Sequence, residues 1–299
     1  MYCLPEPADS SDHGCCRVWP HPGSTAAPSS AETSTCRSAP PPCEATSGNP
    51  LRSRLRNDEP VFGPLILELA SPGLPQIFAA AGADFIMYDQ EAGCLDDATI
   101  KTQIALTRGL GIVPMVNTAW HDYHLLARPL DCGAMGLLVP VVQTRAEAEA
   151  IARITHYPPN GVRGAAFGIA HDDYAGTDLD EAIRIADERT LIAVKIETAR
   201  GVENVEEIIS VPGIDIAFVG HMDLSVSLGT PGRYDTPRFL DCVDKVISAA
   251  RRHGKTGACL VTAPDAARQW IAKGYRFIIF STDVILLTSA FRAGIAGLR

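Results

Sequence analysis

Two acidic residues, Glu197 and Asp223, each follow a short apolar run in the middle of the chain. The runs, LIAVKI and DIAFVG, are short and β-branched, and a helical pattern ending in Pro-Gly separates them. They therefore predict two buried parallel strands joined by a helix, with both carboxylates at the carboxyl ends of the strands. Carboxylate oxygens at neighbouring strand ends suit a hard divalent cation such as Mg²⁺ or Mn²⁺.

Asp223 has a second interpretation that involves no ligand. It precedes Leu-Ser-Val-Ser, and an acidic side chain there can accept hydrogen bonds from the free amides at the start of a helix. Spacing alone leaves the metal ligand and the helix cap equally open.

The elements that would position these carboxylates follow a repeating pattern from residue 49 to residue 299. Eight apolar runs alternate with helical patterns, which predicts an α/β fold of the (β/α)8 type, a TIM barrel. A doubly wound open sheet is the alternative, but no glycine fingerprint follows the first run. The predicted strands are Phe62–Leu69, Asp84–Asp89, Ile112–Asn117, Gly136–Pro140, Leu191–Glu197, Asp215–Gly220, Thr256–Leu260 and Phe277–Ser281.

One connection, between Pro140 and Leu191, is longer than the others. A helical pattern covers residues 144–154, but the second half, HYPPNGVRGAAFGIAHDDYAG, is dense in Gly and Pro. We expect this half to form a loop over the carboxyl face of the barrel, where long loops of such folds carry function.

Residues 1–48 differ in composition from the rest of the chain. They are rich in Ser, Pro, Ala and Thr, and they contain no periodic apolar face that would offset the entropy of ordering. We expect a disordered tail before a single barrel domain of residues 49–299. The tail lacks the charged and apolar regions of a secretory signal, so a cytoplasmic location is expected.

Charge and cysteine content exclude several classes of partner. The net charge is −9, and the chain has no basic block and no run of 18 apolar residues, so neither a nucleic-acid surface nor a membrane span is predicted. None of the nine cysteines forms a CxxC pair, so neither a zinc site nor a disulfide framework is indicated. Cys94 and Cys132 lack a neighbouring base and are interpreted as small buried hydrophobes.

From Asn49 onwards the chain resembles the HpcH/HpaI aldolases, which are metal-dependent class II enzymes acting on pyruvate-like 2-oxo acids. The resemblance implies a (β/α)8 barrel, with Glu197 and Asp223 as ligands of Mg²⁺ or Mn²⁺ and the backbone amide of Met222 binding the substrate carboxylate. The motifs that carry it are Asp89-x-Glu91, Leu130-Asp131-x-Gly133-Ala134, Tyr157-Pro158-Pro159-x-Gly161-x-Arg163-Gly164, Ile196-Glu197-Thr198 and Gly220-x-x-Asp223-Leu224-Ser225.

The sequence departs from the family pattern at three site positions. The family's acid/base histidine after the second strand is Ala92, and its substrate-binding arginine at the end of the third strand is Asn117. The aspartate that supports the histidine, Asp131, is present without that histidine. The usual glutamine two residues before the metal glutamate is Lys195. We therefore expect weakened or altered chemistry that uses Asp89, Glu91, Asp131, Lys195 and His221, with Lys195, Met222, Asp223 and Asn117 contacting the substrate.

Lys195 lies on the same inward strand face as Glu197, because side chains alternate along a strand. One interpretation is that its ammonium replaces the missing arginine and pairs with Glu197, Asp223 or substrate. A second is that it competes with the metal for these carboxylates. A third, used by other barrel aldolases, is a Schiff-base lysine.

Four histidines near strand ends are candidates for a replacement base, and His221 is the best placed because it lies two residues before Asp223. The others, His121, His124 and His171, fit solvated loop positions equally well.

Three functions remain open from the sequence. The first is a carbon–carbon lyase acting on a small 2-oxo acid, the second a metal-dependent decarboxylase of a 2-oxo acid such as oxaloacetate, and the third a non-catalytic barrel that binds a 2-oxo acid. The apolar C-terminal segment TDVILLTSAFRAGIAGL predicts a helix, and family members commonly assemble through such helices, so a homo-oligomer is expected.

Overall fold

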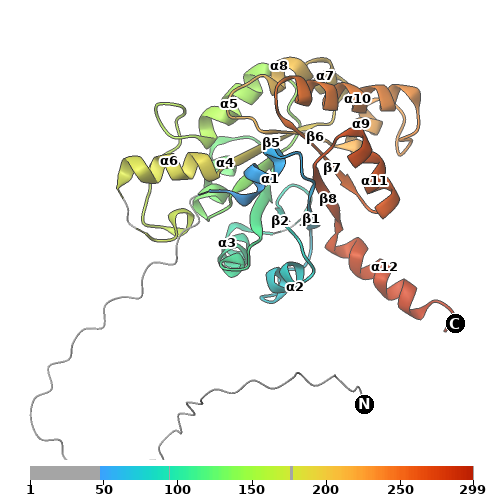
Figure 1. Cartoon of the computed structure of the whole chain (residues 1–299), viewed down its shortest axis with the longest axis horizontal. Helices are drawn as coiled ribbons and strands as arrows, with labels where there is room; N and C mark the ends of the chain where they lie inside the picture. The colour runs from blue at the N-terminus through green and yellow to red at the C-terminus, as the bar shows by residue number, and fades with distance from the viewer. Residues whose placement is uncertain (1–47, 94, 176–177, 299) are drawn as a thin grey trace, which may run out of the picture. The chain divides into compact units, whose positions relative to one another are not determined.

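Eight parallel strands close into a barrel in chain order, from β1 beside β2 round to β8 beside β1 (Figure 1). The structure is a computed structural model, and it describes residues 48–93, 95–175 and 178–298. Closure confirms the predicted (β/α)8 barrel and excludes the open doubly wound sheet. The strands are β1 (Val61–Ile66), β2 (Phe85–Asp89), β3 (Val113–Asn117), β4 (Gly136–Val139), β5 (Leu191–Ile196), β6 (Ile216–Val219), β7 (Thr256–Val261) and β8 (Phe277–Thr282).

Each predicted range overlaps one of these strands, and the largest difference lies in β1. This strand ends at Ile66 rather than Leu69, because the next three backbone amides turn to donate hydrogen bonds to the Asp283 carboxylate. A strand cannot continue where its amides leave the sheet ladder.

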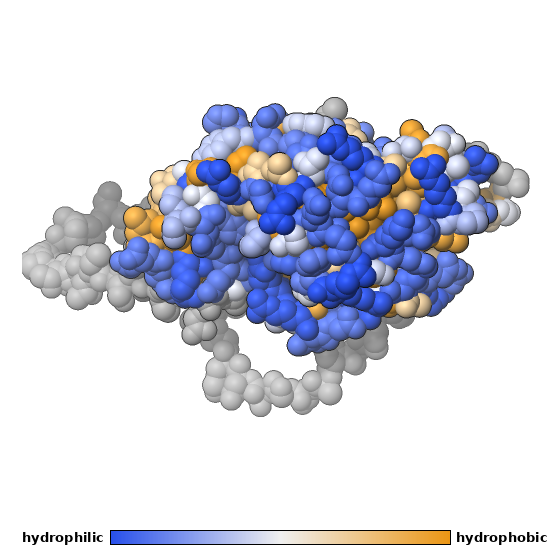
Figure 2. All heavy atoms as spheres, turned by 90° about the horizontal axis from the view of Figure 1, so that it is seen from above, coloured by the Kyte–Doolittle hydropathy of each residue, from blue (hydrophilic) through white to orange (hydrophobic). Residues whose placement is uncertain are grey.

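The helices surround the barrel, and a short N-terminal helix adds to them. The face seen in Figure 2 is mostly hydrophilic with smaller apolar patches. The helices are α1 (Pro50–Arg56), α2 (Leu74–Ala80), α3 (Asp97–Thr107), α4 (Tyr123–Asp131), α5 (Arg145–Thr155), the 3₁₀ turn η1 (Ala170–Asp172), α6 (Leu179–Arg189), α7 (Ala199–Glu203), α8 (Val205–Ile209), α9 (His221–Ser227), α10 (Pro237–Arg252), α11 (Pro264–Lys273) and α12 (Asp283–Ile295).

Two apolar clusters share the strands. Alternation along β5 illustrates this, since Leu191 and Ala193 point into the barrel while Ile192, Val194 and Ile196 face the helices. Leu51 of α1 joins the inner cluster. The same alternation turns Lys195 and Glu197 inward at the carboxyl end, as predicted.

Asn49 fastens the N-terminal helix to the barrel. Its side-chain amide donates to the backbone oxygens of Met135 (3.0 Å) and Arg189 (2.9 Å), and its side-chain oxygen accepts from the Leu51 amide (3.1 Å). The predicted domain start at residue 49 is therefore the first anchored position of this helix. The tail predicted for residues 1–48 lies, apart from Gly48, outside the described residues.

The long connection after β4 departs from the prediction. Residues 145–155 form α5 as expected, but the following segment does not cover the carboxyl face. Arg163 pairs with Asp131 at the end of α4 (2.7 Å), and Asp173 pairs with Arg108 at the end of α3 (3.0 Å). The reason is that each helix returns the chain to the amino ends of the strands, and these ion pairs hold the segment there.

Among the described residues no helix has both the length and the apolar character needed to cross a bilayer.

Candidate active site

Three polar side chains meet at the carboxyl ends of β2 and β3. Asp89 and Asn117 end these strands as register partners, and both are buried. The Asn117 amide donates to Asp89 and to Glu91 (3.0 Å for the latter). Asp89 also accepts from the backbone amides of Ala92 (2.7 Å) and Gly93 (2.6 Å), which shapes the turn after β2. Asn117 therefore holds two carboxylates together where the resemblance leads one to expect an arginine.

Lys195 reaches the same group from β5. Its side chain is buried, and its ammonium donates to the Glu91 carboxylate. Of the partners considered for Lys195, neither Glu197 nor Asp223 pairs with it in this structure, and its pairing with substrate stays a prediction. The turn after β2 places Glu91 at the barrel mouth. The spacing of residues along β5 could not predict this position. Because Glu91 takes the ammonium, the two predicted metal ligands form no ion pair with Lys195.

Glu197 is held at the end of β5 by the backbone. It is 3% exposed, and its Oε1 accepts a hydrogen bond from the Val141 amide at 2.7 Å. Val141 has φ of +53°, an unfavourable conformation for a β-branched residue, which occurs where the surrounding structure enforces it. Gly220 provides the space beside this carboxylate, because a Cβ there would lie 2.4 Å from Glu197 Oε2. The strained backbone of Val141 and the absence of a side chain at Gly220 together orient the Glu197 carboxylate.

The environment raises the pKa of Glu197 to about 7. Burial is the main cause, and the neighbouring carboxylates of Glu91 and Asp223 raise it further, while Lys195 and the Val141 amide lower it. The site thus contains a buried acid close to excess negative charge. A bound divalent cation would offset the free-energy cost of ionising Glu197 there and would favour its ionised form.

Asp223 lies in the first turn of α9, and its side chain is exposed. The N-cap position is Gly220, and no side-chain capping hydrogen bond is found at this helix start. Among the described residues the Asp223 carboxylate accepts no hydrogen bond, so the helix-cap interpretation loses its main support. The oxygens of Glu197 and Asp223 fit a hard cation that retains water ligands. Among the described residues, no group of three or more His, Cys, Asp or Glu side chains is placed to hold a metal ion.

Two other predicted residues lie beside Asp223. Burial lowers the pKa of His221 below its usual value, although the Asp223 carboxylate partly opposes this shift. The His221 ring packs on Tyr234 at 5.0 Å between centroids. A neutral imidazole next to a carboxylate can accept a proton, so His221 remains available as a base. Met222 is 62% exposed, and the role predicted for it uses its backbone amide.

The remaining candidates lie elsewhere. Asp131 pairs with Arg163 at 2.7 Å, and Arg163 and His171 line a small cavity near the starts of β4 and β5. The structure therefore does not bring Asp131 into the site of its own chain. His171 shares a hydrogen bond with the Tyr157 hydroxyl (3.0 Å), and burial lowers its pKa. His121 stacks on Trp120 in the loop before α4.

Cys132 is partly buried against the outer core, as predicted, while Cys94 lies outside the described residues. Val141 and Gly220 were missed as supports of Glu197. Gly220 stood in a recognised motif, but the role of Val141 depends on a backbone angle for which the sequence carries no signal.

A closed (β/α)8 barrel with buried acids, a lysine and two free carboxylates at its carboxyl mouth is the architecture of a barrel enzyme. Residues 65–290 match the family model described as HpcH/HpaI aldolase/citrate lyase. The chain belongs to this family.

Named relatives cover most of the barrel. The chain is 31% identical over 251 residues to a hydroxypyruvate/pyruvate aldolase of Delftia acidovorans, covering 84% of this chain and 93% of the relative. It is 29% identical over 245 residues to a 4-hydroxy-2-oxo-heptane-1,7-dioate aldolase of Escherichia coli, covering 82% and 93%. The solved HpcH/HpaI aldolase of Desulfitobacterium hafniense is similar at a TM-score of 0.78 and 28% identity, covering 83% and 96%.

Proposed function

We propose that this protein is a divalent-metal-dependent carbon–carbon lyase acting on a small 2-oxo acid, with Mg²⁺ or Mn²⁺ held by Glu197 and Asp223. The observation that carries the proposal is that Lys195 pairs with Glu91, while neither Glu197 nor Asp223 forms an ion pair with another described residue. Two relatives named as aldolases of 2-oxo acids support the substrate class.

The chain's own residues would bind and orient the substrate. Glu197, fixed by the Val141 amide, and the exposed Asp223 would hold the cation, and the Met222 amide would contact the substrate carboxylate. When bound, such a cation supplies Lewis-acid stabilisation of the negative charge that develops on the 2-oxo oxygen. Lys195 adds a fixed positive charge at the mouth of the barrel, where an anionic substrate enters.

The weak point of the site is proton transfer. Asp89 accepts hydrogen bonds on both oxygens, and Glu91 Oε2 accepts from both Lys195 and Asn117. These bonds stabilise the ionised carboxylates and make both poor bases for a substrate hydroxyl. Because Ala92 offers no imidazole, we propose that retro-aldol cleavage is slow, with His221 as the available base.

Decarboxylation of a 2-oxo acid such as oxaloacetate is the second candidate. The hydrogen bonds that Asp89 and Glu91 already accept favour it, because they make both carboxylates poor bases. Loss of CO₂ requires stabilisation of the same negative charge but no base for a hydroxyl proton. The residues that this site retains would then suffice.

Proton exchange at C3 of pyruvate tests the charge-stabilising step shared by both reactions. Pyruvate in deuterated buffer is followed by NMR with the protein, with and without added Mn²⁺, and with Glu197→Gln as the matched control. We expect exchange that requires Mn²⁺ and that the variant lacks. Binding of pyruvate without any exchange would instead indicate the non-catalytic barrel. Decarboxylation of oxaloacetate above the metal-only rate would select the second reaction over the first.

We further propose that the protein acts as a homo-oligomer, and the exposed apolar surface of α12 supports this assembly.

A further inference from the structure

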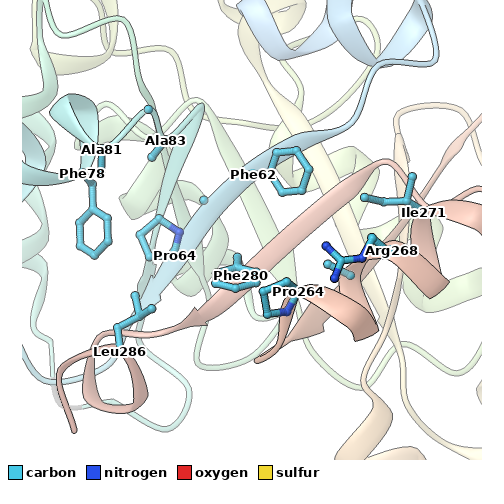
Figure 3. Close-up of a pocket in the computed structure, with 13 residues that line it drawn as sticks. Phe62, Pro64, Phe78, Ala81, Ala83, Pro264, Arg268, Ile271, Phe280 and Leu286 are labelled. Carbon is cyan, nitrogen blue, oxygen red and sulfur yellow. The ribbon is translucent and has the colours of Figure 1, made fainter. Parts of the chain in front are cut away.

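A small cavity with a polar lining lies near the starts of β4 and β5, where α4, α6 and the segment around η1 meet. Its volume is about 10 Å³, which is room for one particle close to a water molecule in size. The larger groove shown in Figure 3 has a different character, because apolar side chains such as Phe62, Phe78 and Phe280 form its walls. The small cavity instead combines several polar side chains with room for a single ion.

Arg163 supplies this cavity with a hydrogen-bond donor that lacks a partner. The residue is 3% exposed, its Nη2 donates to the Asp131 carboxylate at 2.7 Å, and its guanidinium lies over the Tyr157 ring at 4.7 Å. Its Nε is buried and has no hydrogen-bond partner among the described residues. Arginine stays charged and has no acceptor atom, so the missing partner of Nε has to be an acceptor.

His171 lines the same cavity and adds a second unpartnered nitrogen, Nδ1. The residue is 9% exposed, and its Nε2 shares a hydrogen bond with the Tyr157 hydroxyl at 3.0 Å. Burial raises the pKa of Tyr157 to about 12, so this hydroxyl keeps its proton. In the described part of the chain Nε2 is its one partner, and the hydroxyl therefore donates to Nε2. The ring proton of His171 then lies on Nδ1, which is a second vacant donor.

The charge around the cavity is positive. Arg163 and Arg189 both line it, and no acidic side chain is among its lining residues. The carboxylates that pair with these arginines, Asp131 at 2.7 Å and Asp173 at 3.4 Å, lie outside the lining. The side chains that face a bound particle therefore favour an anion over a cation.

The other polar groups of the lining already have partners. Arg189 Nη1 donates to the backbone oxygen of His171 (3.2 Å), and the Thr190 hydroxyl donates to that of Ala186 (2.8 Å). The lining thus presents two vacant donors beside occupied acceptors, which matches a particle that accepts hydrogen bonds and donates none. Backbone oxygens that already accept hydrogen bonds are those of Leu130, Met135, His171, Ala186 and Thr190.

We propose that this cavity binds one chloride ion, held by the Nε–H of Arg163 and the Nδ1–H of His171. A chloride ion is monatomic, accepts hydrogen bonds and carries the charge that the two arginines favour, whereas sulfate, phosphate and carboxylates exceed the volume of the cavity. The ion links η1 to Arg163 and, through Asp131, to the end of α4. The site lies at the opposite end of the barrel from Glu197, so the proposal goes beyond the proposed lyase function and does not depend on it.

The stability of the full-length protein as a function of chloride concentration tests this site. Urea denaturation is measured at one protein concentration and one ionic strength, while sodium chloride replaces sodium gluconate, whose anion is too large for the cavity. We expect the equilibrium constant for unfolding to fall at least about tenfold between zero and about 100 mM chloride, along the curve of a single binding site, because the folded state alone binds the ion.

Two site variants and one control separate the cavity from general effects of salt. His171→Phe removes the Nδ1 donor, and Arg163→Lys removes Nε while it keeps a positive charge beside Asp131. Arg184→Gln is the control, because it removes an exposed arginine of α6 that does not line the cavity. We expect both site variants to lose the tenfold chloride dependence and the control to keep it. Each protein is compared with itself in gluconate, so a change in its basal stability does not enter the comparison.

Crystals of the unmodified protein grown in sodium bromide locate the ion without any variant, since bromide is a close substitute for chloride and scatters anomalously. We expect one anomalous peak between Arg163 Nε and His171 Nδ1. Three results would overturn the proposal: a stability that does not depend on chloride, site variants that keep the full dependence, and a cavity that holds a water molecule only. A bromide peak without chloride dependence in solution would be an adventitious ion only and would overturn it as well.

Discussion

Replacing Glu197 by Gln should make the metal-free protein more stable at pH 8, although the change removes a proposed metal ligand. The buried carboxylate has a folded-state pKa of about 7 against an ordinary value of 4.5. This difference corresponds to roughly 3 kcal/mol of unfavourable free energy for the ionised form in the folded protein. Glutamine keeps an oxygen that can accept the Val141 amide, and it carries no charge.

The sign of the pH dependence follows from where the proton is bound. Between pH 4.5 and about 7 the folded protein retains a proton on Glu197 that the unfolded chain has released. Stability therefore falls as the pH rises through this window, and the penalty is complete above pH 7 and absent below pH 4.5. The glutamine variant lacks this penalty. Its advantage should reach about 3 kcal/mol at pH 8 as an upper value and shrink towards zero at pH 4.5.

Urea denaturation in the presence of EDTA, at one protein concentration, measures this difference at several pH values. Adding Mn²⁺ at pH 8 should reverse the order, because the metal stabilises only the unmodified protein. An advantage that does not change with pH would refute the reasoning, since burial of a charge at residue 197 would then not be its cause. Equal Mn²⁺ stabilisation of both proteins would place the metal elsewhere.

The remaining predictions concern the neighbours of this carboxylate and the start of the barrel. Gly220→Ala should weaken Mn²⁺ binding at least about tenfold by calorimetry, because the new methyl group would displace the Glu197 carboxylate. Unchanged affinity would show that Glu197 can move without loss of metal binding. The combined change Ala92→His, Asn117→Arg and Lys195→Gln should raise retro-aldol cleavage of a 4-hydroxy-2-oxo acid by about 10² or more. Each single change should achieve little, because Asn117 and Lys195 share Glu91 as a partner and Ala92 follows it directly in the same turn. Cleavage by the unmodified protein at a rate that the combined change does not improve would contradict this view. Asn49→Ala should lower the free energy of unfolding by about 2 to 4 kcal/mol, since two backbone oxygens lose their donor; a loss below about 0.5 kcal/mol would show that water replaces it.

The barrel and the inward direction of Lys195 and Glu197 on β5 follow from local features of the sequence. Runs such as LIAVKI are short, apolar and β-branched, and they repeat eight times with helices between them, which leaves few compact arrangements. The two-residue period along a strand also predicts that Lys195 and Glu197 face the interior. These features are local, because they depend on side-chain type and on spacing within one element.

Only the tertiary structure decided which charged groups meet. Lys195 lies two residues from Glu197 in the chain, yet its ammonium pairs with Glu91, 104 residues away. Asp131 follows a recognised motif, but α4 carries it to the other end of the barrel, where Arg163 binds it. Ion pairs depend on the distance between side-chain ends, which the closing of the barrel sets and the spacing of residues does not encode. The direction of α12 has the same origin, since Asp283 is held by amides that lie more than 200 residues before it.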